Sequence, residues 1–84
     1  MSKPIIKRHG KFKLSNMKHG KLYIKGRDVD FRLVKSLGKR YIIIDNEAIG
    51  FTNFDVLFSK LKQKGVTLVV AYDKYNKGHA TILL

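Results

Sequence analysis

The sequence contains no cysteine among its 84 residues. This absence excludes a disulfide framework, a thiolate nucleophile and every metal site that relies on sulfur ligands. It also fits the reducing cytoplasm, and we predict that location. Long hydrophobic runs are missing as well. The longest, residues 66–72, is far shorter than a membrane-spanning helix, and no apolar segment follows the charges near the N-terminus. We therefore expect neither a membrane span nor a targeting segment.

Acidic residues are scarce. Six Asp and Glu stand against eighteen Lys and Arg, which gives a formal net charge of +12 at pH 7. None of the six lies in residues 1–27, a segment that carries nine of the basic residues. Such an excess raises the rate of encounter with polyanions, so nucleic acid is the first partner to consider. Two other interpretations stay open: the lysines keep the protein soluble, or they favour an anionic membrane surface, although no amphipathic basic helix accompanies them.

Groupings of residues that would carry catalysis are not evident. The three histidines, His9, His19 and His79, are scattered and share no i, i+4 spacing that would signal a metal site. No serine lies in a Gly-x-Ser-x-Gly motif, and no glycine-rich phosphate loop is present. A two-metal nuclease gathers several carboxylates in one cleft. The close carboxylates here come in pairs typical of turns: Asp28 with Asp30, and Asp45 with Glu47. We therefore predict no enzymatic activity, no metal and no cofactor.

The hydrophobic pattern predicts one α+β domain over residues 1–84, mostly β, with about six strands and one amphipathic helix in the order β-β-β-β-α-β-β. Alternation of polar and apolar residues predicts strands at 11–16 and 21–25. We expect these two to form a hairpin with lysines on its outer surface. A third strand is predicted at about 29–33. The unbroken apolar run at 41–44 predicts a strand that is covered on both faces or lies centrally in the sheet.

The second half of the sequence predicts a helix over residues 53–64. Thr52 is a suitable N-cap, Asp55 follows three positions later as the acid of a capping box, and Gly65 comes after the last turn. The helix has one apolar stripe that we expect to pack on the sheet, made of Phe54, Leu57, Phe58 and Leu61. Strands are predicted at 66–72 and 79–84. A right-handed crossover into 66–72 is permitted if that strand runs parallel to the strand at 41–45.

A basic, partly aromatic surface is the candidate binding site. Its proposed nucleic-acid contacts are Lys11, Lys13, Lys18, Lys21, Lys25 and Arg27. Four tyrosines are candidates for a dimer or partner interface: Tyr23, Tyr41, Tyr72 and Tyr75. We expect Tyr41 and Tyr72 to belong to the core or an interface, so we do not predict a stacking platform. Cations mixed with aromatic rings suit phosphate contacts and stacking. No helix-turn-helix, zinc finger or aromatic RNA-binding signature is present, so we expect recognition of backbone or shape.

With these elements laid out, the sequence resembles the N-terminal β-domain of the CRISPR spacer-acquisition integrase, particularly its type II branch. The stretches that carry the resemblance are residues 11–14 (KFKL) with 21–25 (KLYIK), residues 40–52 from RYIIID to IGFT, residues 65–73 (GVTLVVAYD) and residues 78–84 (GHATILL). In the family, the second stretch is a buried strand that leads to a threonine- or serine-capped helix. Residues 30–33 lack the proline common before the family's fourth strand, and the basic excess here is larger.

The resemblance implies a setting for the binding activity. In the family, the metal-binding Glu, His and Asp that catalyse integration belong to a helical domain, and no residue here corresponds to them. The β-domain takes part in dimerisation and contacts duplex DNA. We therefore expect a non-catalytic homodimer that docks on an RNA-guided effector nuclease or another CRISPR-associated protein and strengthens its grip on DNA or guide RNA. The alternatives are a phage-encoded inhibitor that imitates the β-domain, a small nucleic-acid-binding protein without a CRISPR link, and a compact ribonuclease toxin.

Overall fold

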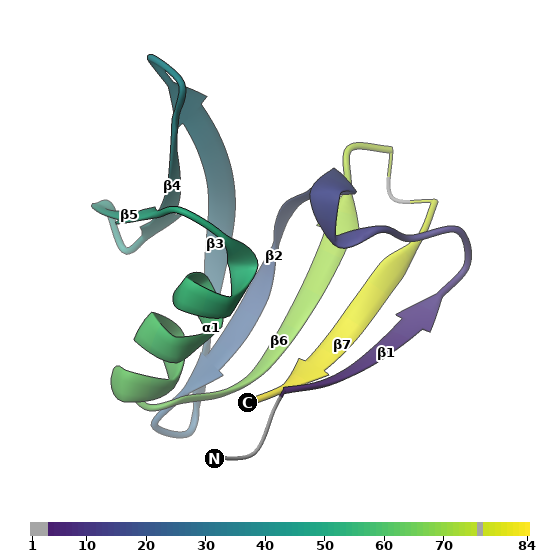
Figure 1. The fold of residues 1–84 in the computed structure, drawn as a ribbon. Coiled ribbons are helices and arrows are strands. Elements are labelled where there is room, and N and C mark those ends of the chain that lie inside the picture. Colours follow the sequence, from purple (N-terminus) through teal and green to yellow (C-terminus); the bar gives the residue numbers. More distant parts are fainter. Residues whose placement is uncertain (1–3, 76) are drawn as a thin grey trace.

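A computed structural model describes residues 4–75 and 77–84. These residues form one seven-stranded antiparallel sheet with one α-helix and a short 3-10 helix (Figure 1). The elements in chain order are β1 (Ile5–His9), η1 (Leu14–Asn16), β2 (Met17–Ile24), β3 (Arg27–Ser36), β4 (Lys39–Ile44), β5 (Glu47–Phe51), α1 (Phe54–Gln63), β6 (Val66–Asp73) and β7 (His79–Leu83). Across the sheet the order is β1-β7-β6-β2-β3-β4-β5. The predicted class, mostly β with one helix, is confirmed.

Three two-residue turns connect β2 through β5 into a meander. Both central residues of each turn have positive φ, between 49° and 81°. This is the geometry of a type I′ turn, whose twist matches that of the strands it joins. The three pairs are Lys25-Gly26, Leu37-Gly38 and Asp45-Asn46. The third turn reverses the chain into β5, a strand that the sequence pattern did not predict.

The N-terminal segment differs from the prediction. Residues 11–16 do not form a strand: the chain leaves β1 at Gly10, and only Leu14–Asn16 is regular, as η1. Phe12 is buried in the core, with 4% of its surface exposed. The alternation at Lys11-Phe12-Lys13 therefore does not indicate a strand. It arises because Phe12 is buried in the core while the lysines on either side of it are exposed. That segment carries the chain from edge strand β1 past β7 and β6 to β2, so the predicted hairpin does not exist.

The parallel pairing of the strand at 41–45 with the strand at 66–72, which the spacing permitted, does not occur. β6 lies between β2 and β7 and is antiparallel to both, whereas β4 pairs with β3 and β5. The additional strand β5 explains the difference. It reverses the chain once more after β4, so α1 starts from the opposite end of the sheet and β6 runs antiparallel to β4. Within β4 only Ile42 is buried, and its neighbours are half-buried, so β4 is not covered on both faces.

The helix is α1, close to the predicted span, but its N-cap differs. Asn53 adopts the extended cap conformation, and its side-chain oxygen accepts a hydrogen bond from the backbone N–H of Val56 at 2.9 Å. Thr52, which was predicted to cap the helix, lies one residue before the cap. Asp55 lies in the first turn, where a negative charge favours the helix dipole. Gly65 follows the helix with a φ of +95°, a value at which L side chains are strained, so its position after the last turn is as predicted.

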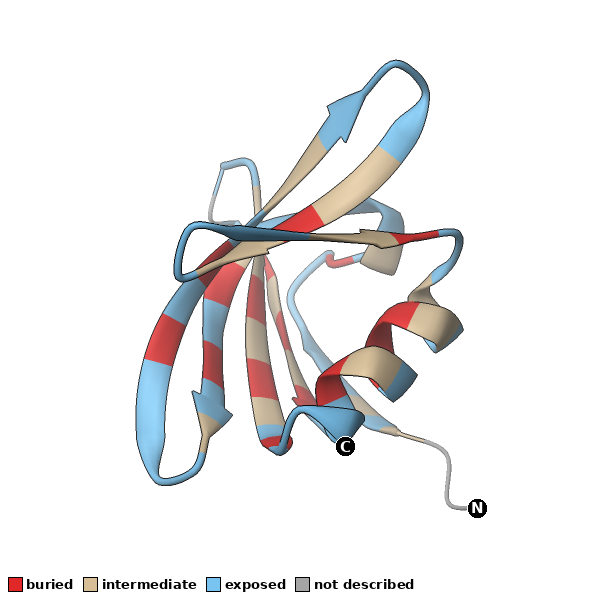
Figure 2. Ribbon diagram, turned by 90° about the vertical axis from the view of Figure 1, so that its left-hand side faces the viewer, coloured by how far each residue is buried: buried red, intermediate tan, exposed pale blue. Residues whose placement is uncertain are grey.

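The hydrophobic core lies between α1 and one face of the curved sheet, which we call the inner face. Figure 2 shows buried residues alternating with exposed ones along the strands. Leu57, Phe58 and Leu61 of the predicted helical stripe are buried. Their counterparts on the sheet include Leu22 and Ile82, whose side chains have no exposed surface. Burial of several such side chains, each contributing about 1.5–3 kcal/mol, fixes the position of α1 and leaves the opposite face of the sheet uncovered by any described helix.

Candidate nucleic-acid interface

The uncovered side of the sheet, which we call the outer face, carries two rows of side chains in register across neighbouring strands. Residues that pair between antiparallel strands point to the same face. Leu22 and its partner Val69 are buried on the inner face, so the neighbouring pairs, Lys21 with Val70 and His19 with Tyr72, belong to the outer face. The outer face therefore combines basic, apolar and aromatic side chains.

Four aromatic rings lie side by side at one end of the outer face, and we call them the aromatic row: His9, His79, Tyr72 and His19. They occupy β1, β7, β6 and β2 in register. Ring centroids are 4.4 Å apart for His9 and His79, 5.9 Å for His79 and Tyr72, and 5.7 Å for Tyr72 and His19. On the next strand, β3, Arg32 pairs with His19 and extends the row with a guanidinium.

The row presents ring edges more than ring faces. The His9 and His79 planes differ by only 10° and those of His19 and Tyr72 by 23°, so these rings stack, whereas Tyr72 and His79 are tilted by 37°. The edges carry the imidazole nitrogens and the tyrosine hydroxyl, which donate and accept hydrogen bonds. With strands about 4.8 Å apart, four rings span about 15 Å. The row can thus contact several phosphate or sugar oxygens along a strand of nucleic acid.

Five exposed lysines gather at the same end of the sheet, and we call them the lysine end: Lys11, Lys13, Lys18, Lys74 and Lys77. They come from the connection after β1, the start of β2 and the β6–β7 loop. The two loops touch, because a Cβ placed on Gly78 would lie 3.2 Å from the carbonyl oxygens of His9 and Lys11. The start of β2 joins them through the pairing of Met17 with Asp73.

Acidic side chains are distributed very differently. Asp73, the acid at the lysine end, uses its Oδ1 atom to accept hydrogen bonds from the backbone N–H groups of Tyr75 and Lys77, both at 3.0 Å. Asp55 lies on α1. The remaining four acids lie near the opposite ends of the β2–β5 strands: Asp28, Asp30, Asp45 and Glu47. Among the described residues, no lysine of the lysine end has a carboxylate within 4.0 Å.

Ion pairs occur at that opposite, mixed-charge end. Lys21 lies 3.6 Å from Asp28, and Arg27 lies 3.6 Å from Asp45. Lys64, just after α1, lies 3.8 Å from Glu47. These pairs are exposed and contribute little to stability. Their main effect is to offset part of the positive charge there, whereas none of the five lysines of the lysine end has such a partner among the described residues.

The six basic residues proposed from sequence do not lie together. Lys11, Lys13 and Lys18 belong to the lysine end, and Lys21 lies in an ion pair on the outer face. Lys25 lies in the β2–β3 turn and Arg27 directly follows it, at the mixed-charge end. Sequence reasoning missed Lys74 and Lys77. The polar loop that carries them was visible, but only the pairing of β2 with β6 places it beside residues 11–18.

The four candidate tyrosines are also dispersed. Tyr23 is 38% exposed on the outer face, and Tyr72 is half-buried within the aromatic row. Tyr75 is 72% exposed in the β6–β7 loop, where the Lys74 ammonium lies 5.6 Å from its ring centroid. Tyr41 is half-buried on β4, opposite Gly50. The tyrosines therefore lie on different parts of the surface. The candidate nucleic-acid interface consists of the lysine end and the aromatic row together.

Comparisons of the chain with protein-family models, curated proteins and solved structures give no match. The resemblance to the integrase β-domain therefore stays a prediction, as does the cytoplasmic location. Over residues 4–75 and 77–84, no helix has the length and apolar character needed to cross a membrane. In the same part of the chain, no three His, Asp or Glu side chains are grouped as metal ligands.

Proposed function

We propose that the protein binds nucleic acid through the phosphate backbone and catalyses no reaction itself. The observation that carries this proposal is the convergence of five exposed lysines, with no described acid in ion-pair range, beside a row of hydrogen-bonding rings. Each phosphate that a lysine neutralises releases condensed counterions, and this release favours binding whatever the sequence. Lysines at one end of the sheet, held by contacting loops and paired strands, can engage several phosphates at once.

The aromatic row and Arg32 supply the second part of the interface. Imidazole, phenol and guanidinium groups donate hydrogen bonds to phosphate and sugar oxygens, and such contacts set the register of the nucleic acid. These contacts do not recognise the base sequence. Contacts limited to phosphates and sugars suit a protein without a recognition helix. The expected ligand is therefore a backbone of regular shape, such as duplex DNA.

Titration of labelled duplex DNA with the protein, followed by fluorescence anisotropy, tests this proposal. We expect binding at low salt that weakens steeply as salt is added, with little difference between unrelated duplex sequences. Catalysis is followed in the same samples, and we expect the DNA to remain intact. Absence of binding at low salt, or binding insensitive to salt, would contradict the proposal.

The integrase resemblance adds a narrower setting, an accessory role beside an RNA-guided effector nuclease. In such a complex, base pairing with the guide selects the sequence, and a basic accessory adds phosphate contacts that raise affinity without changing that selection. The lysine end supports this role because its charge is not offset locally. The inhibitor alternative uses the same surface with the opposite effect. A gene position beside effector and repeat array favours the accessory, and a prophage position favours the inhibitor.

A second row on the outer face supports dimerisation, and we call it the apolar row: Ile5, Leu83, Leu68 and Tyr23. These residues pair in register across β1, β7, β6 and β2 at the end away from the lysine end. Ile5 is 58% exposed and Leu83 46%, and a contiguous exposed apolar surface is typical of an interaction site. We infer that a second copy docks here, because this arrangement keeps the two lysine ends apart and limits their repulsion.

Light scattering over a range of protein concentrations tests the dimer. We expect twice the chain mass for the unmodified protein and the single-chain mass for Leu83→Asp, because a carboxylate buried in an apolar interface loses its hydration. Gln63→Asp, exposed on α1 on the opposite side of the sheet, is the control and keeps the dimer. A concentration-independent monomer of the unmodified protein would overturn the inference.

A further inference from the structure

The turn between β3 and β4 exposes a leucine at the end of a hairpin. The four residues 36–39, which we call the tip, are all exposed, and Leu37 is 100% exposed. In the two other type I′ turns the corresponding position holds a polar residue, Lys25 or Asp45. Leu37 also has a φ of 52°, a conformation that suits glycine, asparagine and aspartate better than leucine. Neither burial nor turn geometry therefore accounts for a leucine at this position.

The hairpin projects from the same end of the sheet as the lysine end. Pairing between β2 and β3 stops at His19 and Arg32, whereas β3 continues to Ser36, paired with β4 alone. Because β2 begins at the lysine end and β3 is antiparallel to it, the last residues of β3 extend in that direction. At about 3.3 Å per residue, they reach about 13 Å beyond the last pair with β2. In Figure 1 the hairpin and the β6–β7 loop point the same way.

Basic side chains flank the leucine. Residues 31–44 include Arg32, Lys35, Lys39 and Arg40 and no Asp or Glu. Lys35 and Lys39 are exposed, and in the part of the chain that the structure describes neither has a carboxylate within 4.0 Å. An apolar side chain between cations is complementary to a groove of duplex DNA, where stacked base pairs lie between two rows of phosphates.

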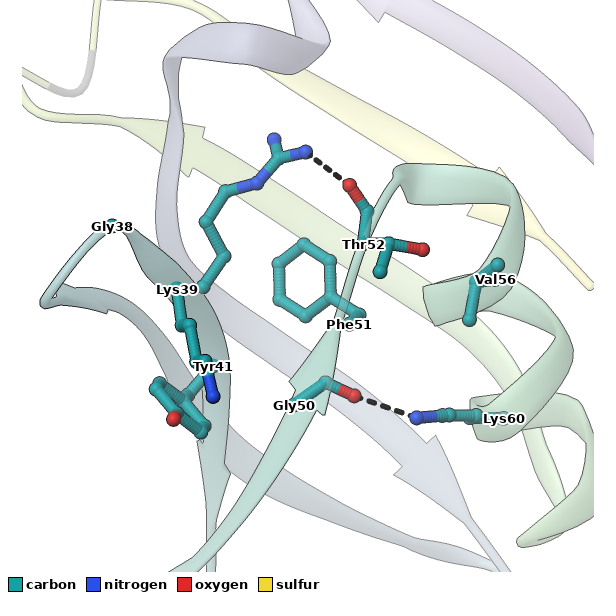
Figure 3. Close-up of a pocket in the computed structure, with 9 residues that line it drawn as sticks. Gly38, Lys39, Tyr41, Gly50, Phe51, Thr52, Val56 and Lys60 are labelled. Atoms are coloured by element: carbon teal, nitrogen blue, oxygen red, sulfur yellow. Dashed lines mark hydrogen bonds between the residues drawn. The ribbon is translucent and has the colours of Figure 1, made fainter.

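Contacts at the base of the hairpin hold it in place. The Arg40 guanidinium donates a hydrogen bond to the carbonyl oxygen of Thr52 at 2.6 Å and lies over two phenylalanine rings, 5.4 and 5.5 Å from their centroids. On the neighbouring strand β5, the carbonyl oxygen of Gly50 accepts a hydrogen bond from Lys60 of α1 at 2.6 Å. Figure 3 shows both bonds, which go to separate carbonyl groups. A hairpin held in this way loses little conformational freedom when its tip meets a ligand.

We propose that the hairpin enters the minor groove of bound duplex DNA and inserts Leu37 between two base pairs, which bends the duplex. Leucine is among the apolar side chains that act as such wedges, and their insertion unstacks a base step and bends the duplex toward the major groove. Lys35 and Lys39 then contact phosphates beside the inserted side chain. The longest dimension of the molecule is 31 Å, or about nine base-pair steps, so the tip and the lysine end can contact one duplex. This inference rests on the proposed function and adds to it a change in DNA shape.

A lipid surface is the other environment that a basic hairpin with an apolar tip could enter. One leucine is too small to hold a protein there, because even a single myristoyl chain gives only marginal membrane binding. A base step, in contrast, needs only one inserted side chain. Duplex DNA is therefore the occupant that the tip favours.

Energy transfer between dyes at the two ends of a short duplex measures the bend, and fluorescence anisotropy measures binding in the same samples. We expect the unmodified protein at saturation to bend the duplex by at least about 20°. Leu37→Asn is expected to remove the bend but to keep affinity within about tenfold, because the lysine end is unchanged. Its Tm should not fall, since asparagine suits a type I′ turn. Leu37→Met keeps an apolar wedge and should retain the bend.

The matched control is Lys25→Asn, which places the same residue at the same position of the β2–β3 turn and should keep the bend. A second measurement uses a duplex with one mismatched pair, where unstacking costs less than in an intact duplex. We expect the unmodified protein to bind it about tenfold more tightly than the intact duplex, and Leu37→Asn to lose that preference.

The inference is overturned if the bound duplex stays straight, if Leu37→Asn bends it as the unmodified protein does, or if Lys25→Asn also removes the bend. If Leu37→Asn keeps the bend but weakens binding to vesicles of phosphatidylserine and phosphatidylcholine, the tip enters lipid and not DNA. Absence of duplex binding at low salt would contradict the proposed function and this inference with it. A bound but straight duplex would contradict this inference alone.

Discussion

Reversal of four charges at the lysine end, by Lys11→Glu, Lys18→Glu, Lys74→Glu and Lys77→Glu together, is expected to abolish binding to duplex DNA under conditions where the unmodified protein binds. Each substitution removes a phosphate contact and places a carboxylate where a phosphate would lie. Loss of this many contacts is expected to lower affinity on the order of 10³-fold near 0.1 M salt. Fluorescence anisotropy gives the measurement, and circular dichroism confirms the fold.

The matched control changes the same number of charges at the mixed-charge end. It combines Lys25→Glu, Arg27→Glu, Lys62→Glu and Lys64→Glu. Net charge is identical in the two variants, so long-range attraction to DNA falls equally in both. Any further loss in the lysine-end variant comes from the contacts themselves. Equal affinities of the two variants would show that overall charge drives binding, and the assignment of the interface would then be wrong.

Gly20→Ala is expected to destabilise the protein strongly, although it adds only one methyl group. Gly20 lies in β2, the strand that pairs with both β6 and β3. A Cβ at this position would lie 2.0 Å from the backbone oxygen of Val70 and 2.9 Å from the Phe31 ring. Relief of the first contact requires movement of β6 relative to β2, and displacement of Phe31 disturbs the core. Overpacking of this kind costs about 3 kcal/mol, a large fraction of the stability of a small domain.

Thermal unfolding followed by circular dichroism measures the effect. For a domain of this size, a loss of about 3 kcal/mol corresponds to a fall in Tm of roughly 15 °C. Gly50→Ala is the matched control, because a Cβ there meets only the Tyr41 ring at 3.5 and 3.6 Å and the Arg40 carbonyl oxygen at 3.9 Å, ordinary van der Waals distances. We expect its Tm to stay close to that of the unmodified protein. A Gly20→Ala protein as stable as Gly50→Ala would contradict the close approach of β2 and β6.

The predictable part of the fold came from long, regular local signals. The stripe on α1, the glycine after it and the β-branched runs of β4 and β6 can each be recognised in the local sequence. The misplaced first strand has a different origin, since burial of Phe12 depends on a core assembled from distant residues. β5 was missed because Asp45-Asn46, a type I′ turn without glycine, looks like the end of a strand and not like a hairpin.

The candidate site was less predictable, because it depends on strand order. The histidines stand far apart in sequence and looked unrelated, yet the pairing of β1 with β7, β7 with β6 and β6 with β2 aligns them. Strand order also separates Lys25 and Arg27 from Lys11 and Lys13 and adds Lys74 and Lys77 in their place. Lys60 on α1 likewise donates a hydrogen bond to the Gly50 carbonyl oxygen on β5, a long-range contact that no local pattern encodes.

The most direct test of the proposed interface is the salt dependence of duplex DNA binding by the unmodified protein. If all five lysines of the lysine end contact phosphates, the logarithm of the binding constant should fall linearly with the logarithm of salt concentration, with a slope of about −4.5. The lysine-end variant should lose most of that slope, and the matched control should retain it. A slope near zero for the unmodified protein, or equal slopes for both variants, would contradict the account.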